Sequence, residues 1–196
     1  MRENCVMGAT KEEVMEQLSH VLTIIPKNYI DALLTLHAKL EDKNVEWVVG
    51  GDLGEELRTI DVHPDCTEIL TSKEGALKIA AAVKEFNPSE ISLEIQELSR
   101  NANVKEKEYP VYARSYYFDF NIGTTKVKVY GDIQYRINSW DWGDKLSFTP
   151  EYVYLVGKKI AVIPLSFKYE FYQLLGWTDN AERVKQALDK QHFHRR

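Results

Sequence analysis

Cysteine is scarce in this sequence. Cys5 and Cys66 are the two cysteines among 196 residues, so the chain has neither a disulfide framework nor a Cys-x-x-Cys zinc motif. Because thiols stay reduced inside cells, this usage favours a cytoplasmic protein. The sequence also lacks an apolar run of the roughly 18–20 residues that a membrane span needs. Its first residues become charged before any apolar run develops, which is not the pattern of a signal peptide. We therefore expect no membrane partner.

An excess of positive charge is missing as well. The chain has 25 Lys and Arg against 30 Asp and Glu, a formal net charge of −5. Nucleic-acid-binding domains usually carry a basic field, so the overall charge does not indicate a nucleic-acid partner, although a local basic patch stays open. Four catalytic or nucleotide-binding patterns are also missing from the sequence: a Walker loop, Gly-x-Gly-x-x-Gly, Gly-x-Ser-x-Gly and a Ser-His-Asp arrangement.

What is present is an ordinary globular composition, with 44% hydrophobic and 28% charged residues. Apolar periodicity and capping residues predict helices at residues 10–24, 26–42, 72–86, 165–177 and 179–188. Alternating β-branched and aromatic runs predict strands at residues 45–49, 67–70, 111–122, 125–137, 152–157 and 159–164. Thr71 and Glu74 form a capping-box pattern, and Gly123-Thr124 and Gly157-Lys158 are expected to be tight turns.

This order of elements predicts an α+β fold, in which helices flank a mixed β-sheet. One domain is expected over residues 1–196. It would comprise N-terminal helices (1–44), a sheet core (45–164) and C-terminal helices (165–196).

The stretch "WVVGGDLGEEL" places Gly50-Gly51 between a predicted strand and a predicted short helix. Glycines let the backbone approach a ligand closely, and the first N–H groups of a helix favour anions. A triphosphate fits such a turn. A tight strand-to-helix turn without a ligand explains the same residues, because two adjacent glycines are common.

Acidic residues follow in "DVHPDCTEIL". Carboxylates that hold Mg²⁺ against phosphate need i, i+2 spacing on a strand, because alternate side chains share a face. The strand offers Cys66-x-Glu68 instead, with Asp65 just before it. A thiol prefers softer metals than Mg²⁺. Asp65 supplies the missing carboxylate only if the strand bulges near Pro64.

Residues 47–79, together with "KIAVIPLSFKYEFYQLLGWTDNAERVKQAL", resemble the nucleotidyltransferase (DNA polymerase β-like) superfamily, and more closely its small prokaryotic and archaeal members. The resemblance implies transfer of a nucleoside monophosphate, with triphosphate at Gly50-Gly51 and Mg²⁺ as cofactor at the acidic strand. Glu68 matches the second acid of the family's Asp-x-Asp pair, whereas Cys66 stands at the first. Trp177 replaces the arginine of the family's terminal Leu-Gly-Arg.

The family's third carboxylate lies on a later central strand, and Asp119 and Asp132 are the two candidates. Asp65 and Glu68 are the expected metal ligands. Arg58 and Lys73 flank the site in sequence and either neutralise phosphate or are solvated surface charges. Trp140 and Trp142 are either a base-stacking platform or packed over the sheet.

Three functions follow from these observations. The first is a nucleotidyltransferase relative that binds nucleoside triphosphate with reduced or lost transfer activity, which Cys66 favours. The second is an active Mg²⁺-dependent nucleotidyltransferase. The third is an interaction protein that keeps the fold alone, since one fold hosts many functions. The sequence does not specify the nucleotide, the acceptor or the oligomeric state.

Overall fold

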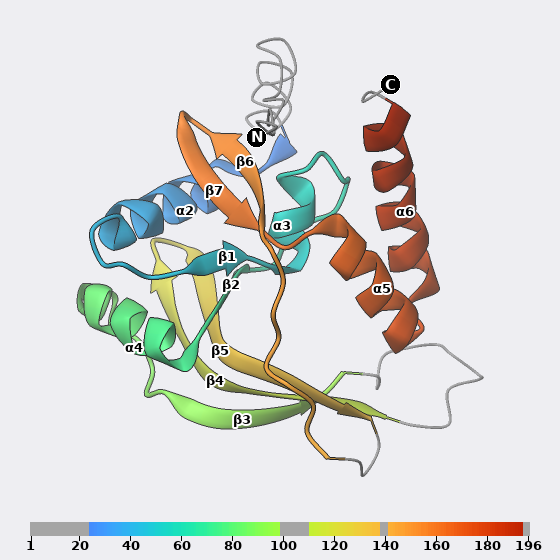
Figure 1. The fold of residues 1–196 in the computed structure, drawn as a ribbon. Helices are drawn as coiled ribbons and strands as arrows, with labels where there is room; N and C mark the ends of the chain where they lie inside the picture. The colour runs from blue at the N-terminus through green and yellow to red at the C-terminus, as the bar shows by residue number, and fades with distance from the viewer. Residues whose placement is uncertain (1–23, 99–109, 138–140, 194–196) are drawn as a thin grey trace, which may run out of the picture.

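A computed structural model describes residues 24–98, 110–137 and 141–193. The predicted helix at residues 10–24 lies outside these ranges except for residue 24, and Trp140 lies outside them as well. The described part contains a seven-stranded sheet with strand order β3-β4-β5-β2-β1-β7-β6 (Figure 1). The strands are β1 (Trp47–Val49), β2 (Thr67–Thr71), β3 (Ser92–Glu97), β4 (Val111–Ile122), β5 (Thr125–Ile137), β6 (Glu151–Leu155) and β7 (Lys158–Val162).

The sheet is mixed, as predicted. Strand β2 is its pivot, because it pairs antiparallel with β1 and parallel with β5. Strand β1 also pairs parallel with β7, while β3, β4 and β5 form an antiparallel meander and β6 and β7 a hairpin. Parallel neighbours need a crossover connection, and the chain between β2 and β5 supplies one through a helix and two further strands.

Helices cover the sheet on both sides. The helices are α2 (Lys27–Leu40), α3 (Gly51–Glu56), α4 (Lys73–Ala82), the 3-10 turn η1 (Lys84–Phe86), α5 (Leu165–Leu175) and α6 (Thr178–Phe193). Figure 1 shows α2 and α4 on one side of the central strands and α5 and α6 on the other. In the part of the chain that the structure describes, no helix combines the length and the apolar character needed to cross a bilayer.

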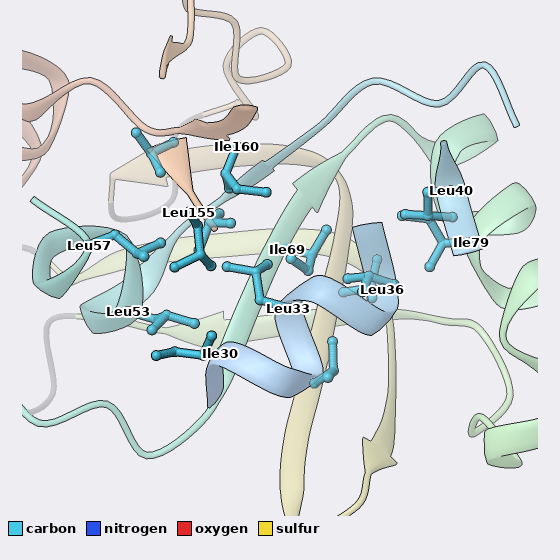
Figure 2. Close-up of a cluster of buried hydrophobic side chains, with 14 of the residues drawn as sticks. Ile30, Leu33, Leu36, Leu40, Leu53, Leu57, Ile69, Ile79, Leu155 and Ile160 are labelled. Carbon is cyan, nitrogen blue, oxygen red and sulfur yellow. The ribbon is translucent and has the colours of Figure 1, made fainter. Parts of the chain in front are cut away.

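The larger hydrophobic core lies between the sheet and helices α2, α3 and α4. Figure 2 shows Leu33 and Leu36 of α2 reaching toward Ile69 at the centre of the sheet, and each of the three side chains is at most 1% exposed. Burial alternates along the strands: Val127 and Val129 of β5 and Phe118 and Phe120 of β4 face this core. The residues between them face the opposite way, toward the side of the sheet where α5 and α6 lie.

A second cluster joins α5 and α6 to the segment after α3. It contains Leu165, Tyr172 and Val184, packed with Ile60 and Val62. The two clusters flank α3; Leu53 of the helix and Leu57, the residue that follows it, belong to the larger core. Helix α3 is therefore held on two sides although it has six residues.

Three local predictions need correction. Strand β3 was not predicted, because an edge strand with both faces largely exposed needs no apolar face and is held by its backbone ladder to β4. Ser72, and not Thr71, caps α4, since its hydroxyl accepts the Gly75 N–H at 3.0 Å. The last hairpin turns at Val156-Gly157, one residue earlier than predicted, because Lys158 is already paired with Leu155.

Candidate functional site

The turn between β1 and α3 lies directly against the acidic strand. The Gly50 N–H donates to the Glu68 carbonyl at 2.8 Å, which joins the turn to β2. Gly51 has φ +57, a left-handed conformation that favours glycine. A Cβ added to Gly51 would lie 2.8 Å from Glu68 Oε2, closer than real contacts allow. Glycine therefore permits both the backbone conformation and the close approach of the Glu68 carboxylate. We call Gly50-Gly51 the elbow.

A buried ionic cluster fixes the elbow from the other side. Lys168 of α5 donates from Nζ to the Gly51 carbonyl at 2.7 Å. The same ammonium pairs with the carboxylate of Glu55, whose side chain is fully buried. Tyr172 donates its hydroxyl to this carboxylate, and Arg183 of α6 lies 3.7 Å from its second oxygen. Helices α5 and α6 thus hold α3, and with it the elbow, through the buried charges of Glu55 and Lys168 and the partly exposed Arg183.

A row of charged side chains crosses three strands beside the elbow. Glu68 of β2 is registered with Lys128 of β5, and Lys128 is registered with Asp119 of β4. Directly opposed residues of neighbouring strands share a face, so the three side chains line the side of the sheet turned away from the α2–α4 core. The row therefore has the charge order acid, lysine, acid.

Asp119 is already neutralised within this row. Its carboxylate pairs with Lys126 at 2.8 Å and accepts the Tyr117 hydroxyl at 2.7 Å. These two contacts lower the pKa of Asp119. Asp119 is therefore an ionised carboxylate that has a cation partner other than Lys128.

Cys66 and Asp65 extend the row at the start of β2. The backbone bends at Asp65 and Cys66, and the charge of Asp65 acts on Glu68, three residues further on. Burial raises the pKa of the Cys66 thiol to about 12, and the hydrogen bond to Asp65 and the charge of Glu68 add to the effect, while Lys128 opposes it. At neutral pH position 66 therefore holds a neutral thiol, which is a poor ligand for Mg²⁺.

The charges of Glu68 and Lys128 balance each other. Burial raises the pKa of Glu68, and Lys128 and Lys168 oppose this rise. For Lys128, burial lowers the pKa, but the hydrogen bond with Cys66 and the charges of Asp65 and Glu68 outweigh it and the net pKa is raised. Lys128 is thus a cation held among acids at neutral pH.

Neither a protein-family model nor a curated protein sequence matches this chain. Among solved structures it is similar to a proposed nucleotidyltransferase from Thermotoga maritima, at 27% identity and a TM-score of 0.61, over 85% of this chain and 96% of that chain. The match runs over nearly all of the neighbour. This chain has the nucleotidyltransferase-superfamily fold. The resemblance seen in the sequence is confirmed at the level of the fold.

Two antibiotic-modifying proteins are similar at a lower level. They are ANT(2'')-Ia in complex with adenylyl-2''-tobramycin and the lincosamide antibiotic adenylyltransferase LnuA in its lincomycin-bound form. Each is 10% identical with a TM-score of 0.48; the first covers 82% of this chain and 89% of its own, the second 84% and 99%. At these scores neither informs the function of this chain.

The side chains at the metal position expected for this fold can be compared with the ligands that Mg²⁺ prefers. In the part of the chain that the structure describes, no group of three or more His, Cys, Asp or Glu is arranged to hold a metal ion. The strand next to β2 carries Lys128 opposite Glu68, so β5 presents an ammonium and not an oxygen ligand at that point. Together with the neutral thiol of Cys66, this donor set does not fit Mg²⁺, which prefers oxygen ligands in octahedral geometry.

The structure separates the two candidates for the third carboxylate. Asp119 lies in the row with Lys128 and Glu68, although its carboxylate is occupied by Lys126. Asp132 lies at an irregularity of β5 with φ +52 and pairs with Lys145 at 2.6 Å. Asp119 is therefore the candidate that the fold brings toward Glu68, and Asp132 is a paired bulge residue.

Arg58 and Lys73 do not meet the elbow as the sequence suggested. Arg58 is 6% exposed, and its guanidinium pairs with Glu151 of β6 at 2.7 Å, which ties the end of α3 to the edge of the sheet. Lys73 donates to the Tyr116 hydroxyl at 3.1 Å. Tyr116 is two residues before Phe118 on β4, so both side chains lie on the α4 side of the sheet, the face opposite Glu68. The reason to place phosphate on either cation is therefore lost.

Trp142 is also engaged within the protein. The guanidinium groups of Arg114 and Arg136 lie 4.6 and 4.7 Å from its ring centre. This arrangement agrees with packing over the sheet, since both arginines belong to neighbouring strands β4 and β5. The aromatic side chains on the α5 side are others: Tyr135 and Phe171 approach to 5.1 Å.

Sequence reasoning missed four residues of the site: Lys128, Lys168, Glu55 and Asp52. Asp52 follows the elbow directly, and burial raises its pKa, as does the charge of Glu55, while Lys168 opposes the rise. No local signal set Lys128 apart, because "KVKVY" alternates lysine with valine as an ordinary half-exposed strand does. Lys168 and Glu55 are 113 residues apart in the sequence, and no local pattern joins them.

The second buried carboxylate of α3 gives a pH-dependent prediction. Glu56 is 1% exposed, and its two carboxylate oxygens lack hydrogen-bond partners among the described residues. Burial raises the pKa of Glu56, with Asp61 and Asp52 adding to the effect and His63 opposing it. A raised carboxyl pKa means that ionisation disfavours the folded state as pH rises. Glu56→Gln should therefore raise the melting temperature at pH 7, by about 2–4 °C if the gain is about 1 kcal/mol.

The gain from Glu56→Gln should shrink as pH falls, and it should vanish below the ordinary glutamate pKa, where both forms are neutral. Thermal unfolding followed by circular dichroism between pH 4 and pH 8 measures it. Glu90→Gln, at an exposed position, is the matched control and should show no such trend. A gain that is the same at all pH values would show that the charge of Glu56 is not responsible.

Proposed function

We propose that this protein binds a nucleoside triphosphate at the elbow and has little or no nucleotidyl transfer activity. One observation carries the proposal: the elbow and Glu68 are in direct contact, so that a Cβ on Gly51 would collide with the Glu68 carboxylate. This is the juxtaposition of glycine turn and acidic strand that the nucleotidyltransferase fold uses. The chain keeps the shape of the site while its ligating groups have changed.

Binding of a phosphate chain is supported by the groups around the elbow. The two glycines have no side chains of their own, and Leu70 and Glu68 lie against the positions that their Cβ atoms would take, so the elbow is packed onto the acidic strand. Lys168 is placed at the Gly51 carbonyl, and Lys128 lies in the row that includes Glu68. Aromatic rings follow on the same side of the sheet, where Tyr117 and Tyr130 approach to 5.3 Å. Aromatic faces of this kind can stack a nucleobase.

Loss of transfer is supported by the chemistry of the same residues. Phosphoryl and nucleotidyl transfer depends mostly on positioning and on charge neutralisation by metal ions. Here the position of the first acid in the expected pair holds Cys66, a thiol whose pKa is raised to about 12. A cation, Lys128, stands where the neighbouring strand faces Glu68. Both changes weaken the hold on a divalent ion, so transfer should be slow or absent.

Thermal shift and label transfer test the two halves of this proposal. Each of ATP, GTP, CTP and UTP is added to the full chain, and the preferred one should stabilise the fold by about 2.7 kcal/mol at a hundredfold excess over its Kd. With triphosphate labelled at the α-phosphate and Mg²⁺ present, no label should pass to the protein or to added hydroxyl acceptors.

Two results would contradict the proposal in different ways. If none of the four triphosphates changes the melting temperature or gives a calorimetric signal, the chain uses its fold for another purpose, such as interaction with a partner. If label is transferred and Glu68→Ala abolishes the transfer, the protein is an active nucleotidyltransferase. Cys66→Asp distinguishes these cases further, because a gain of transfer in that variant would mark the native site as one that has lost its metal.

A further inference from the structure

Lys128 occupies the centre of the charged row, and Asp119 does not need it as an ion-pair partner. It lies opposite Glu68 on one side and opposite Asp119 on the other. Asp119 has its own cation, since Lys126 pairs with it at 2.8 Å. By strand register Lys128 stands between Glu68 and Asp119, and the acids whose charges raise its pKa are Asp65 and Glu68. Its charge therefore acts on the acids of β2.

These acids are the ones that the fold would use for a metal. A divalent ion between Asp65 and Glu68 would have to approach the ammonium of Lys128, and like charges at short distance repel strongly when they are partly removed from water. The position also offers a thiol at Cys66 where an oxygen ligand is needed. The positive charge beside these acids is therefore the side chain of Lys128 and not a bound metal ion.

We propose that Lys128 takes the place of the divalent cation, so that the phosphate ligand of the elbow is bound without metal. The ligand in this statement rests on the proposed function, whereas the exclusion of metal does not. Lys128 would act as a positioning and charge-neutralising group for the phosphates, with Lys168 as the second ammonium at the elbow. No reaction step is implied, since an ammonium has no vacant position to activate water or an acceptor hydroxyl.

Manganese binding tests the exclusion of metal without any nucleotide. The loss of the free Mn²⁺ electron paramagnetic resonance signal is measured with wild type and with Cys66→Asp/Lys128→Ala. We expect no binding by wild type at millimolar Mn²⁺ and clear binding by the double variant, because it offers carboxylates at 65, 66 and 68 without the ammonium. Wild-type binding that is lost in Glu68→Ala would overturn the inference, as would failure of the folded double variant to bind.

Nucleotide binding tests the role of Lys128 itself. Calorimetric titration with the triphosphate found to bind is carried out in EDTA and in Mg²⁺, and the two Kd values should agree within about two-fold, a difference of less than 0.5 kcal/mol. Lys128→Gln should weaken binding about ten-fold or more, since a charge-assisted contact to phosphate is lost. Lys126→Gln is the matched control, because Lys126 lies two residues away on the same face of β5 and pairs with Asp119.

The outcomes separate this inference from the proposed function. Binding that requires Mg²⁺ overturns the inference and leaves the proposed function standing. Equal weakening by Lys126→Gln and Lys128→Gln also overturns it, because general surface charge would then explain the effect. If no triphosphate binds under either condition, the proposed function fails, and the manganese experiment alone decides whether Lys128 excludes a metal.

Discussion

Glu55→Ala should lower the free energy of unfolding by about 3–5 kcal/mol, the usual cost of removing one partner from a buried ion pair. The carboxylate is fully buried and accepts the Tyr172 hydroxyl while it pairs with Lys168. Without Glu55, the Lys168 ammonium, whose side chain is 8% exposed, keeps the Gly51 carbonyl but loses its buried counter-charge. Urea-induced unfolding, followed by fluorescence and circular dichroism, measures the change.

Two comparisons give this result its meaning. Asp31→Ala removes an exposed ion pair, Lys27–Asp31, and should cost less than about 1 kcal/mol. The double variant Glu55→Leu/Lys168→Met removes both charges and should be less destabilised than Glu55→Ala, because no unpaired charge is left buried. If Glu55→Ala costs no more than Asp31→Ala, the cluster is hydrated in solution and does not hold α3.

Gly51→Ala should destabilise the protein by about 2–5 kcal/mol, through two separate effects. A left-handed backbone costs a non-glycine residue about 1–2 kcal/mol. Insertion of a methyl group into a packed site costs about 1–3 kcal/mol more, and here the new Cβ would lie 2.8 Å from Glu68 Oε2. Chemical denaturation measures the stability. In calorimetry the variant should also bind triphosphate more weakly, since the methyl group displaces Glu68 at the elbow.

Gly123 provides the matched control for the backbone effect. It has φ +60, close to that of Gly51, and a Cβ added there meets nothing within 4 Å. Gly123→Ala should therefore show the backbone cost alone and leave nucleotide binding unchanged. Glu68→Ala combined with Gly51→Ala should recover part of the loss in stability, because it removes the group with which the methyl collides. Equal costs for the two single glycine variants would mean that Glu68 moves aside freely.

Most elements of the fold were predictable because their signals are local. The alternation of Val127 and Val129 with polar residues gives the β5 strand, and Gly50-Gly51 marks the end of β1. Strand β3 was missed for a physical reason. Its exposed Leu93 and Ile95 alternate with polar residues, and the strand exists because β4 offers a backbone edge to pair with.

The site was predictable in outline and not in composition. Glu68 and the elbow are separated by 17 residues, within one strand–helix–strand unit, and their contact follows from the motif. Lys128 joins them through the parallel pairing of β2 with β5. The register between two strands 60 residues apart cannot be predicted from the sequence of either strand alone. Arg58 illustrates the opposite error. It was predicted at the elbow because it is close in sequence, whereas its buried guanidinium pairs with Glu151.

The link between Lys168 and the elbow has an optical consequence. Tyr172 lies on the same helix as Lys168, shares the Glu55 carboxylate with it, and stacks on the indole of Trp177 at 5.7 Å. A shift of α3 caused by an occupant of the elbow therefore changes the surroundings of a native fluorophore. When the other tryptophans are replaced by phenylalanine, the fluorescence emission of Trp177 reports ligand binding at the elbow without an attached dye.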